Sequence, residues 1–264
     1  MDPDVGQSGF WFHGRLLPGA DAHFYVTEEA IGDGLMLEVL WDGIALWSRP
    51  DLEPPQPSWR DAIRSPEQAA RMLRLISGAY GLLTGDVYEA RLTGWVEAKE
   101  AKWGDTVVGF SVERFNPHGP GRKGRTNARM ATAAKLAVAA SRAPGTRLAL
   151  LDLYATPQAP DDDAFFYAYR AVEDLARHYG GGDEGQKAWD ALHAHCGYRD
   201  GKKRLKPLTD VRQAIAHGNE SDPAVVYARE NRGTVLNLAR YTLARAFVND
   251  PDLPLSRSDV QGYR

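Results

Sequence analysis

The chain lacks several features that mark other classes of protein. It has one cysteine, Cys196, in 264 residues, so it cannot form an internal disulfide, and we expect it in a reducing compartment. No uninterrupted apolar run reaches the roughly 18 residues that a membrane-spanning helix needs. The first residues, MDPDVGQSGF, are acidic and polar where a secretory signal would be basic and then apolar. These absences predict a cytoplasmic protein with no membrane attachment.

A strong charge of either sign is also lacking. The formal net charge is -3, which excludes a uniformly basic coat for nucleic acid, so any polyanion binding would need local patches. Lysine is scarce, since only eight of the 32 basic residues are lysine and the rest are arginine. The planar guanidinium of arginine suits phosphate better than an ammonium group does. With 43% hydrophobic and 25% charged residues, the composition is that of a globular protein.

The two halves of the chain differ in the periodicity of their apolar residues. The first half contains alternating apolar and polar segments separated by Gly-Asp-Gly and Asp-Gly turns, a pattern typical of β-strands. One helix interrupts these segments, with Ser65 as its cap and Pro66 at its first position. The predicted fold class is α+β, with a mainly β N-terminal module containing one helix (1–116), a basic Gly-rich linker (117–126), an all-α helical bundle (127–250) and a C-terminal tail (251–264).

Helical periodicity dominates the second half of the chain. Acidic residues at 161–163 favour the start of one helix, and glycines at 180–182 end it. Asp222 followed by Pro223 opens the last helix in the usual order of cap and first residue. The expected helices lie near 127–141, 146–156, 162–179, 185–196, 207–217 and 223–248.

The most informative segment is LTDVRQAIAHGNE. Its apolar stripe begins at Val211, and Gly218 is expected to stop the helix, so Arg212 and His217 are held close to a helix end. Five positions place the two side chains roughly 140° apart around an ideal helix. They could converge on one ligand if His217 sits on an unwound last turn, or if two copies of the helix meet across a dimer.

This segment resembles the HEPN superfamily of all-helical domains, whose mark is an arginine, four to six further residues and then a histidine near a helix end. Arg212-Gln-Ala-Ile-Ala-His217-Gly fits that pattern, and the preceding helix FFYAYRAVEDLARHYG is similar to the aromatic and acidic helix found before the motif. The resemblance covers about residues 125–250. The family usually has Asn, Asp or His after the arginine, where this chain has Gln213. The layout also resembles bacterial defence proteins of the ApeA type and, more faintly, proteins labelled as methylamine-utilisation MauJ.

The resemblance implies a metal-independent endoribonuclease without a cofactor, which leaves a 2′,3′-cyclic phosphate on RNA. His217 is suited to acid–base work near neutral pH, and Arg212 can hold the phosphoryl oxygens as they gain charge. Gln213 can hydrogen-bond, although its longer side chain changes the geometry, and Glu173 on the preceding helix completes the candidate site. The alternative is a non-catalytic binding or assembly module, in which Arg212 pairs with an acid such as Glu173 and His217 caps the helix.

A basic segment, YRDGKKRLKP, comes just before the motif helix and is expected to be a loop. Beside a phosphodiester site it would hold an RNA backbone, whereas the alternative is a solvated loop between helices. Expected partners are RNA, a second copy of the chain bound through the helical bundle, and a trigger or partner protein at the N-terminal module. The candidate RNA-binding residues are Arg199, Lys202, Lys203, Arg204 and Lys206.

Two other groups match metal chemistry only loosely. The HAHC segment, residues 193–196, offers two histidines and a cysteine, but residues two apart do not share a helix face, so no metal site is expected. Asp86, Glu97 and Lys99 match the Asp…Glu-x-Lys pattern of metal-dependent nucleases, a pattern that strand alternation alone often produces.

Overall fold

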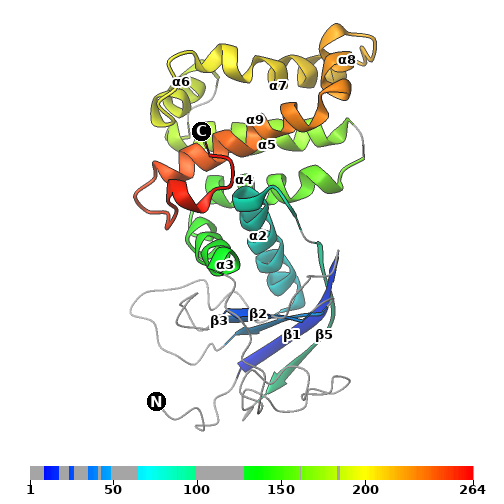
Figure 1. Cartoon of the computed structure of the whole chain (residues 1–264), viewed down its shortest axis with the longest axis vertical. Helices are drawn as coiled ribbons and strands as arrows, with labels where there is room; N and C mark the ends of the chain where they lie inside the picture. The colour runs from blue at the N-terminus through cyan, green and yellow to red at the C-terminus, as the bar shows by residue number, and fades with distance from the viewer. Residues whose placement is uncertain are drawn as a thin grey trace. The chain divides into compact units, whose positions relative to one another are not determined.

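The structure is a computed structural model, and its described residues are 9–17, 24–26, 35–40, 43–48, 65–87, 89–98, 128–160, 162–182 and 185–263. The chain forms two compact units, which we call the N-terminal unit (1–77 and 88–138) and the C-terminal unit (78–87 and 139–264). Helix α2 (Pro66–Thr84) contributes residues to both (Figure 1).

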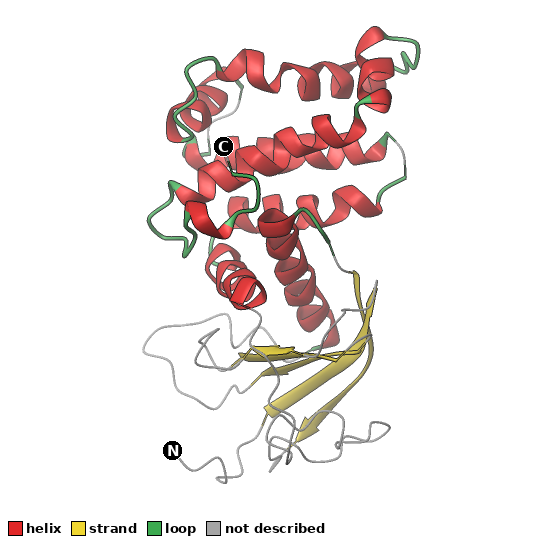
Figure 2. Cartoon of the chain, in the orientation of Figure 1, coloured by secondary structure: helices red, strands yellow, loops and turns green. Residues whose placement is uncertain are grey.

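The N-terminal unit contains a five-stranded antiparallel sheet with the order β2-β3-β4-β1-β5. Its strands are drawn in yellow in Figure 2. Strand β1 lies between β4 and β5 and pairs with both, so that Phe12 lies opposite Leu46 of β4 and opposite Trp95 of β5. Phe12 is fully buried. The strands are β1 (Gly9–Leu17), β2 (Phe24–Val26), β3 (Leu35–Leu40), β4 (Gly43–Ser48) and β5 (Glu89–Ala98).

The predicted fold class, α+β with a mainly β module at 1–116, is wrong as stated, because helix predominates in the described part of the chain and a mainly β module is not shown. The region that contains the sheet also carries most of the 19-residue helix α2. Period-2 alternation in short windows indicates local strands but does not define a module. The alternating segment 105–115 and the expected linker 117–126 lie outside the described residues.

Helix α2 starts as its sequence predicts. The Gln68 N–H donates to Ser65 Oγ at 3.3 Å, and the Ser65 N–H donates to Gln68 Oε1 at 3.1 Å. This reciprocal pair is a capping box, which satisfies amide groups that the first turn leaves without helical partners. Pro66 occupies the first helical position, where its missing N–H costs nothing.

The C-terminal unit is a bundle of helices, and the predicted all-α character of this region is confirmed within the described residues. Its helices are α4 (Pro144–Ala155), α5 (Asp163–Tyr179), α6 (Gln186–His195), α7 (Gly201–Ala216), α8 (Pro223–Glu230) and α9 (Arg232–Val248), with the end of α3 (Ala128–Ser141) and the 3₁₀ turns η3 (Thr156–Gln158) and η4 (Arg257–Asp259).

Helix α5 lies at the centre of the bundle and packs against α4, α6, α7 and α9 (Figure 1). Its buried side chains recur every three or four residues, as Phe165, Ala168, Val172 and Leu175 illustrate. That spacing keeps one stripe of the helix apolar and leaves the opposite side for polar groups. None of the described helices is long and apolar enough to cross a membrane.

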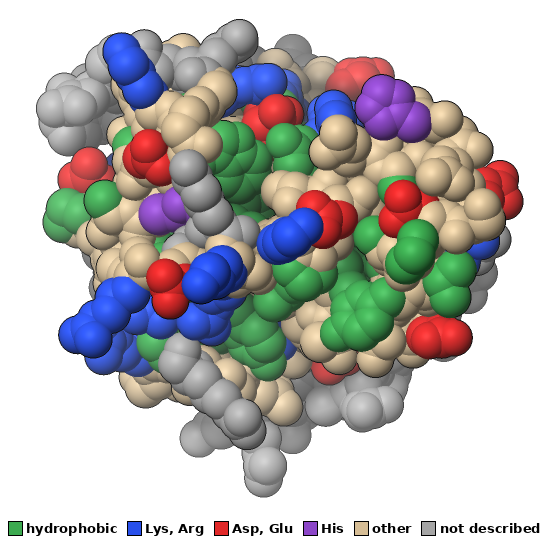
Figure 3. Space-filling model, turned by 90° about the horizontal axis from the view of Figure 1, so that it is seen from above, with side chains coloured by type: hydrophobic (Ala, Val, Ile, Leu, Met, Phe, Trp, Pro, Cys, Tyr) green, Lys and Arg blue, Asp and Glu red, His purple; other side chains and the backbone are tan. Residues whose placement is uncertain are grey.

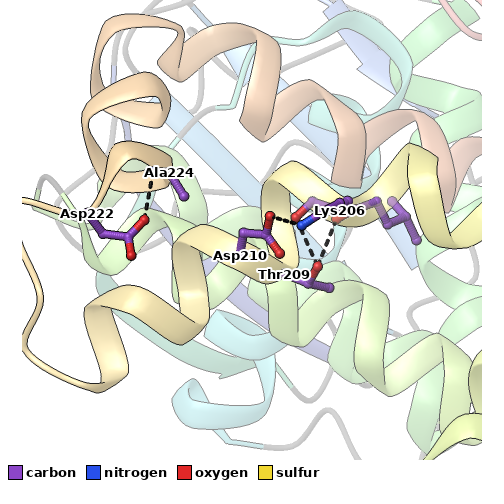
Figure 4. A network of polar contacts seen from close by, with 6 residues as sticks. Lys206, Thr209, Asp210, Asp222 and Ala224 are labelled. Carbon is purple, nitrogen blue, oxygen red and sulfur yellow. Dashed lines mark hydrogen bonds and ion pairs between the residues drawn. The ribbon is translucent and has the colours of Figure 1, made fainter.

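Most of the predicted helix bounds are confirmed, since α3, α4, α5 and α6 begin and end within two residues of the expected positions. The expected helix at 223–248 is instead two helices that meet at Asn231. Its start is as predicted, because the Asp222 carboxylate accepts a hydrogen bond from the Ala224 N–H at 2.8 Å, with Pro223 at the first position (Figure 4).

Arg240 of α9 closes the C-terminal end of α2. Its guanidinium group donates hydrogen bonds of 3.0–3.2 Å to the carbonyl oxygens of Gly81, Leu82, Leu83 and Gln261. Arg240 is only 8% exposed, and burial lowers the pKa of its guanidinium. It thereby satisfies carbonyls that the last turn of α2 leaves without helical partners.

Candidate functional site

The motif segment ends α7 with a backbone arrangement that fixes its last residues. Gly218 has a φ of 70°, its N–H donates to the Ile215 carbonyl at 2.9 Å, and the Asn219 N–H donates to the Ala214 carbonyl at 3.0 Å. These two bonds form a Schellman motif, in which a glycine adopts the left-handed conformation just after the helix. The prediction that Gly218 stops this helix is confirmed, and His217 is the C-cap residue.

Arg212 lies one turn before the end of α7 and is half-buried. Its guanidinium carbon sits 5.1 Å from the centroid of the Tyr169 ring of α5, a cation–π contact. Within the described residues Arg212 forms no ion pair. The positive charge of Arg212 therefore remains available to an anion, and the neighbouring Gln213 is exposed.

His217 is exposed, and in the described part of the chain its imidazole makes no hydrogen bond. Its backbone N–H donates to the carbonyls of both Gln213 and Ala214 at 3.2 Å, so the hydrogen bonding of α7 continues up to this residue. The last turn is not unwound, and the offset of roughly 140° from Arg212 is kept. One chain does not bring these two groups together by unwinding.

Glu173, the fourth candidate, lies on α5 one turn after Tyr169. Its carboxylate forms an ion pair of 3.3 Å with Arg177, and no ion pair joins it to Arg212 among the described residues. Burial raises the pKa of Tyr169, and the nearby charge of Glu173 raises it further while Arg212 opposes the shift. The structural role proposed for an Arg212–Glu173 pair is therefore not found; Tyr169 interacts with both residues instead.

The basic segment before the motif is not a loop, which corrects the prediction. Helix α7 begins at Gly201, so Lys203, Arg204 and Lys206 lie on its first two turns. The error came from Pro207, which suits a first helical position but here lies inside the helix. Exposed residues of this set are Arg199, Lys203, Arg204 and Lys206, while for Lys202 only the helical backbone is described.

Two members of the basic set have defined partners. Lys206 forms an ion pair with Asp210 one turn along α7, beside Thr209 (Figure 4). Its charge is therefore partly neutralised. Arg204 has no ion pair among the described residues, and its guanidinium carbon lies 4.8 Å from the centroid of the Tyr198 ring.

The HAHC residues face different neighbours and do not converge. His193 is buried and lies near Trp189 and Tyr198. His195 stacks on the Tyr179 ring at 3.8 Å. Cys196 is buried, and burial raises the pKa of its thiol to about 12. Across the described residues, no group of three or more His, Cys, Asp or Glu side chains is placed to hold a metal ion.

The loose nuclease pattern is described only in part. Asp86 is exposed, and its N–H donates to Thr84 Oγ1 at 3.1 Å just after α2. Glu97 lies on β5, and Lys99 falls outside the described residues.

Sequence reasoning did not identify the aromatic residues around the motif. Tyr169 and Trp189 lie 5.8 Å apart between ring centroids, and Trp189 lines a small pocket of about 110 Å³ together with Glu173, Arg177 and Gly185. The spacing of Tyr169 and Glu173 at i and i+4 was the available signal, because such residues share a helix face. Trp189 belongs to another helix and gave no signal of this kind.

Asp152 of α4 is buried, and Asp174 of α5 is half-buried. Burial raises the pKa of Asp152 to about 6, with Arg170 opposing the shift and Asp174 adding to it. Asp152 lies 3.3 Å from the Arg170 Nε. Burial also raises the pKa of Asp174. The ion pair of Asp152 with Arg170 links α4 to α5, and the raised pKa of Asp152 makes this contact depend on pH.

Comparison with known proteins yields no match: no family model, no curated protein and no solved structure is similar to this chain.

Proposed function

We propose that this protein is a metal-independent endoribonuclease of the HEPN type, which acts in the cytoplasm in a bacterial defence or stress response. The proposal rests on the exposure of His217 and on the absence of an ion pair at Arg212 among the described residues. His217 is an exposed imidazole, and Arg212 is a guanidinium without an ion pair among the described residues, both at one end of α7. An exposed imidazole can exchange a proton with a bound RNA, and a guanidinium without an ion pair can bind its phosphate group.

In the proposed reaction, His217 accepts the proton of the RNA 2′-hydroxyl, whose oxygen then bonds to the adjacent phosphorus. The bond from phosphorus to the 5′-oxygen of the next nucleotide breaks, and that oxygen takes a proton from a second acid. The products are a 2′,3′-cyclic phosphate and a free 5′-hydroxyl. Arg212 stabilises the added charge on the phosphoryl oxygens, and the exposed amide of Gln213 offers a further donor.

A homodimer would supply the second acid. One chain contributes one His217, and the regular end of α7 keeps it away from the direction of Arg212. A two-fold contact through the bundle would place two copies of the motif side by side and form a composite site. Within this proposal, a trigger or partner protein binds the N-terminal unit and controls the site.

The alternative function is a non-catalytic binding or assembly module. One observation favours it: Arg212 already contacts the Tyr169 ring, so it contributes to the packing of α7 on α5. In that case the unit binds RNA or a nucleotide without cutting it.

The two functions are separated by incubating the full chain with a labelled single-stranded RNA in EDTA. A nuclease gives fragments that end in a 2′,3′-cyclic phosphate, and a single 2′-deoxy substitution protects the nucleotide that carries it, because the attacking hydroxyl is gone. DNA of the same sequence stays intact. Lack of cleavage, or cleavage at the 2′-deoxy position, excludes the proposed mechanism.

The dimer is tested by mixing Arg212→Ala protein with His217→Ala protein. Partial recovery of cleavage is expected if each site draws groups from both chains, and the specific activity should fall on dilution. A monomer with undiminished specific activity contradicts the composite site and leaves single-chain cleavage open to the first assay.

A further inference from the structure

Four aromatic rings form a continuous row across the C-terminal unit, which we call the ring ladder: Tyr169 of α5, Trp189 and His193 of α6, and Tyr198 just after α6. Successive ring centroids are 5.8, 6.2 and 6.4 Å apart, and every pair is tilted. Three of the rings are half-buried, and His193 is buried between them. Three rings of the ladder are therefore partly exposed to solvent.

Arginines stand at both ends of this ladder. Arg212 contacts the Tyr169 ring at one end, while Arg204 and Arg245 contact the Tyr198 ring at the other, at 4.8 and 5.1 Å from its centroid. None of the three guanidinium groups has an ion pair within the described part of the chain. In a protein with a net charge of -3, this is a local positive surface rather than a general one.

Several other arginines of the same unit are neutralised by carboxylates, unlike these three. Arg177 pairs with Glu173, Arg170 with Asp152, and Arg229 with Asp162. The arginines of the ladder thus keep their charge beside half-buried aromatic rings. Figure 3 shows Lys and Arg side chains gathered on one side of a face that also exposes hydrophobic side chains.

The middle of the ladder is hollowed beside Trp189. The pocket of about 110 Å³ there is lined by α5 and α6 and has Arg177 and Glu173 at its edge. A flat group that entered it would lie against the indole ring, between the two arginine ends.

We propose that the ring ladder binds a single strand of RNA, with unpaired bases against Tyr169 and Trp189 and with phosphates at Arg212 and at the Arg204–Arg245 end. This inference rests on the proposed function in naming RNA. Single-stranded nucleic acid is bound in this way elsewhere, by aromatic surfaces for the bases and positive groups for the backbone. A double helix keeps its bases stacked on one another and cannot offer them to the rings.

The spacing along α7 fits a short strand. Arg204 and Arg212 are eight residues apart on one helix, which corresponds to about 12 Å along its axis. Stacked nucleotides advance by about 3.4 Å each, so roughly three to four of them cover that length. The Arg212 end of the ladder is also the end of α7 that carries His217, so a strand bound on the ladder leads to the proposed cleavage site.

The test measures fluorescence anisotropy of a labelled single-stranded RNA of about twelve nucleotides, within the range that such sites cover, in EDTA. All proteins carry His217→Ala, so that binding is measured without cleavage. Trp189→Ala is expected to weaken binding about tenfold, while Trp189→Phe keeps most of the affinity because its ring still stacks. Arg204→Gln changes an exposed side chain, and it should weaken binding severalfold and lower the salt dependence by about one counterion.

The matched control is Arg257→Gln, since this exposed arginine of η4 also contacts a tyrosine ring, at 5.9 Å from the Tyr263 centroid. It should bind RNA as the parent protein does. Unchanged affinity in both Trp189→Ala and Arg204→Gln overturns the proposal, as does tighter binding of duplex RNA or of single-stranded DNA of the same sequence. If the wild type cleaves RNA while these variants bind it normally, the binding role of the ring ladder is wrong and the nuclease proposal is retained. If the variants lose affinity but the wild type does not cleave RNA, the ring ladder is retained as a binding site and the nuclease proposal is wrong.

Discussion

Two helix ends in the C-terminal unit are closed in opposite ways. The end of α2 is closed by a buried side chain, because Arg240 donates four hydrogen bonds to backbone carbonyls and is itself 8% exposed. The end of α7 is closed by the backbone alone, through Gly218 and the two bonds of its Schellman motif. The first end holds its arginine in buried hydrogen bonds, while among the described residues the second leaves Arg212 without an ion pair and the His217 imidazole without a hydrogen bond.

This difference indicates which helix end has side chains available to bind a ligand. The guanidinium of Arg240 is buried and donates to four carbonyls, whereas that of Arg212 contacts a ring and forms no ion pair among the described residues. Since the backbone closes α7 without help, its polar side chains are not needed for that purpose. We therefore expect substitutions at the α7 end to change activity and substitutions at the α2 end to change stability.

The largest effect is expected at the α7 end. Arg212→Ala and His217→Ala should each reduce RNA cleavage by about a thousandfold or more, because they remove the phosphate-stabilising charge and the acid–base group. Their midpoints of thermal unfolding should stay within a few degrees of the wild type. Cleavage rates in EDTA, together with circular dichroism on heating, check both statements.

Normal cleavage by both variants would place the chemistry elsewhere. Asp86, Glu97 and Lys99 would then be the next residues to change, and metal dependence would be the first property to measure. Arg229→Ala serves as a control, since this arginine of α8 is ion-paired with Asp162 and lies in neither the motif nor the ladder.

The second effect is expected at the α2 end. Arg240→Met keeps much of the side-chain volume but leaves carbonyls of Gly81, Leu82 and Leu83 without this donor, so it should lower the free energy of unfolding by about 2–4 kcal/mol. Chemical denaturation measures the change. Arg257→Met, at an exposed arginine, should stay within about 0.5 kcal/mol of the wild type. Equal losses in the two variants would mean that the buried hydrogen bonds of Arg240 contribute little.

The same contrast explains what could be predicted from the sequence. The caps at Ser65 and Asp222 and the glycine stop at Gly218 depend on neighbouring residues, so local patterns predicted them. Arg240 acts on a helix more than 150 positions away, and no local pattern indicates that. Pro207 shows a further limit, because a local rule placed the start of α7 at a residue that lies inside the helix.

Only the part of the candidate site that lies in one short segment could be predicted from the sequence. Arg212 and His217 follow from one short motif, and the structure places both near the end of α7. Trp189 and Tyr198 reach Tyr169 only through the packing of α6 on α5, so the ring ladder could not be inferred from spacing. The mainly β reading of the first 116 residues failed because it extended local alternation to a whole region.

The third effect concerns pH and lies away from both helix ends. Burial raises the pKa of Asp152 to about 6 from the 3.8 of an ordinary aspartate, so the folded state holds this proton more tightly than the unfolded state. Its contribution to stability is therefore present below about pH 4 and is lost as the pH rises to about 6. The Asp152→Asn variant cannot lose this proton. The difference in unfolding free energy between the variant and the wild type should therefore shift in favour of the variant by about 1–3 kcal/mol between pH 4 and pH 8. Urea denaturation at the two pH values measures it, and a difference independent of pH contradicts the assignment.

The smallest effect tests the backbone closure of α7 itself. Gly218 has a φ of 70°, where an alanine side chain crowds its own backbone, at a cost of about 1 kcal/mol. A Cβ at this position meets no atom within 4 Å, so Gly218→Ala should lose about that amount and no more. Gly233→Ala is the matched control, because its Cβ is equally unobstructed but its residue lies in α9, where alanine is favoured over glycine. Its free energy of unfolding should stay the same or rise.

Cleavage by the Gly218→Ala variant then sharpens the comparison of the two helix ends. The Schellman bonds set the direction in which the chain leaves His217, so relaxing them should lower the cleavage rate more than the small loss of stability explains. At a temperature where both glycine variants remain fully folded, a lower rate in Gly218→Ala alone would mean that the backbone turn positions His217. Equal rates in the two variants would mean instead that His217 acts from a range of positions. The closure of α7 would then serve only stability, as the closure of α2 does.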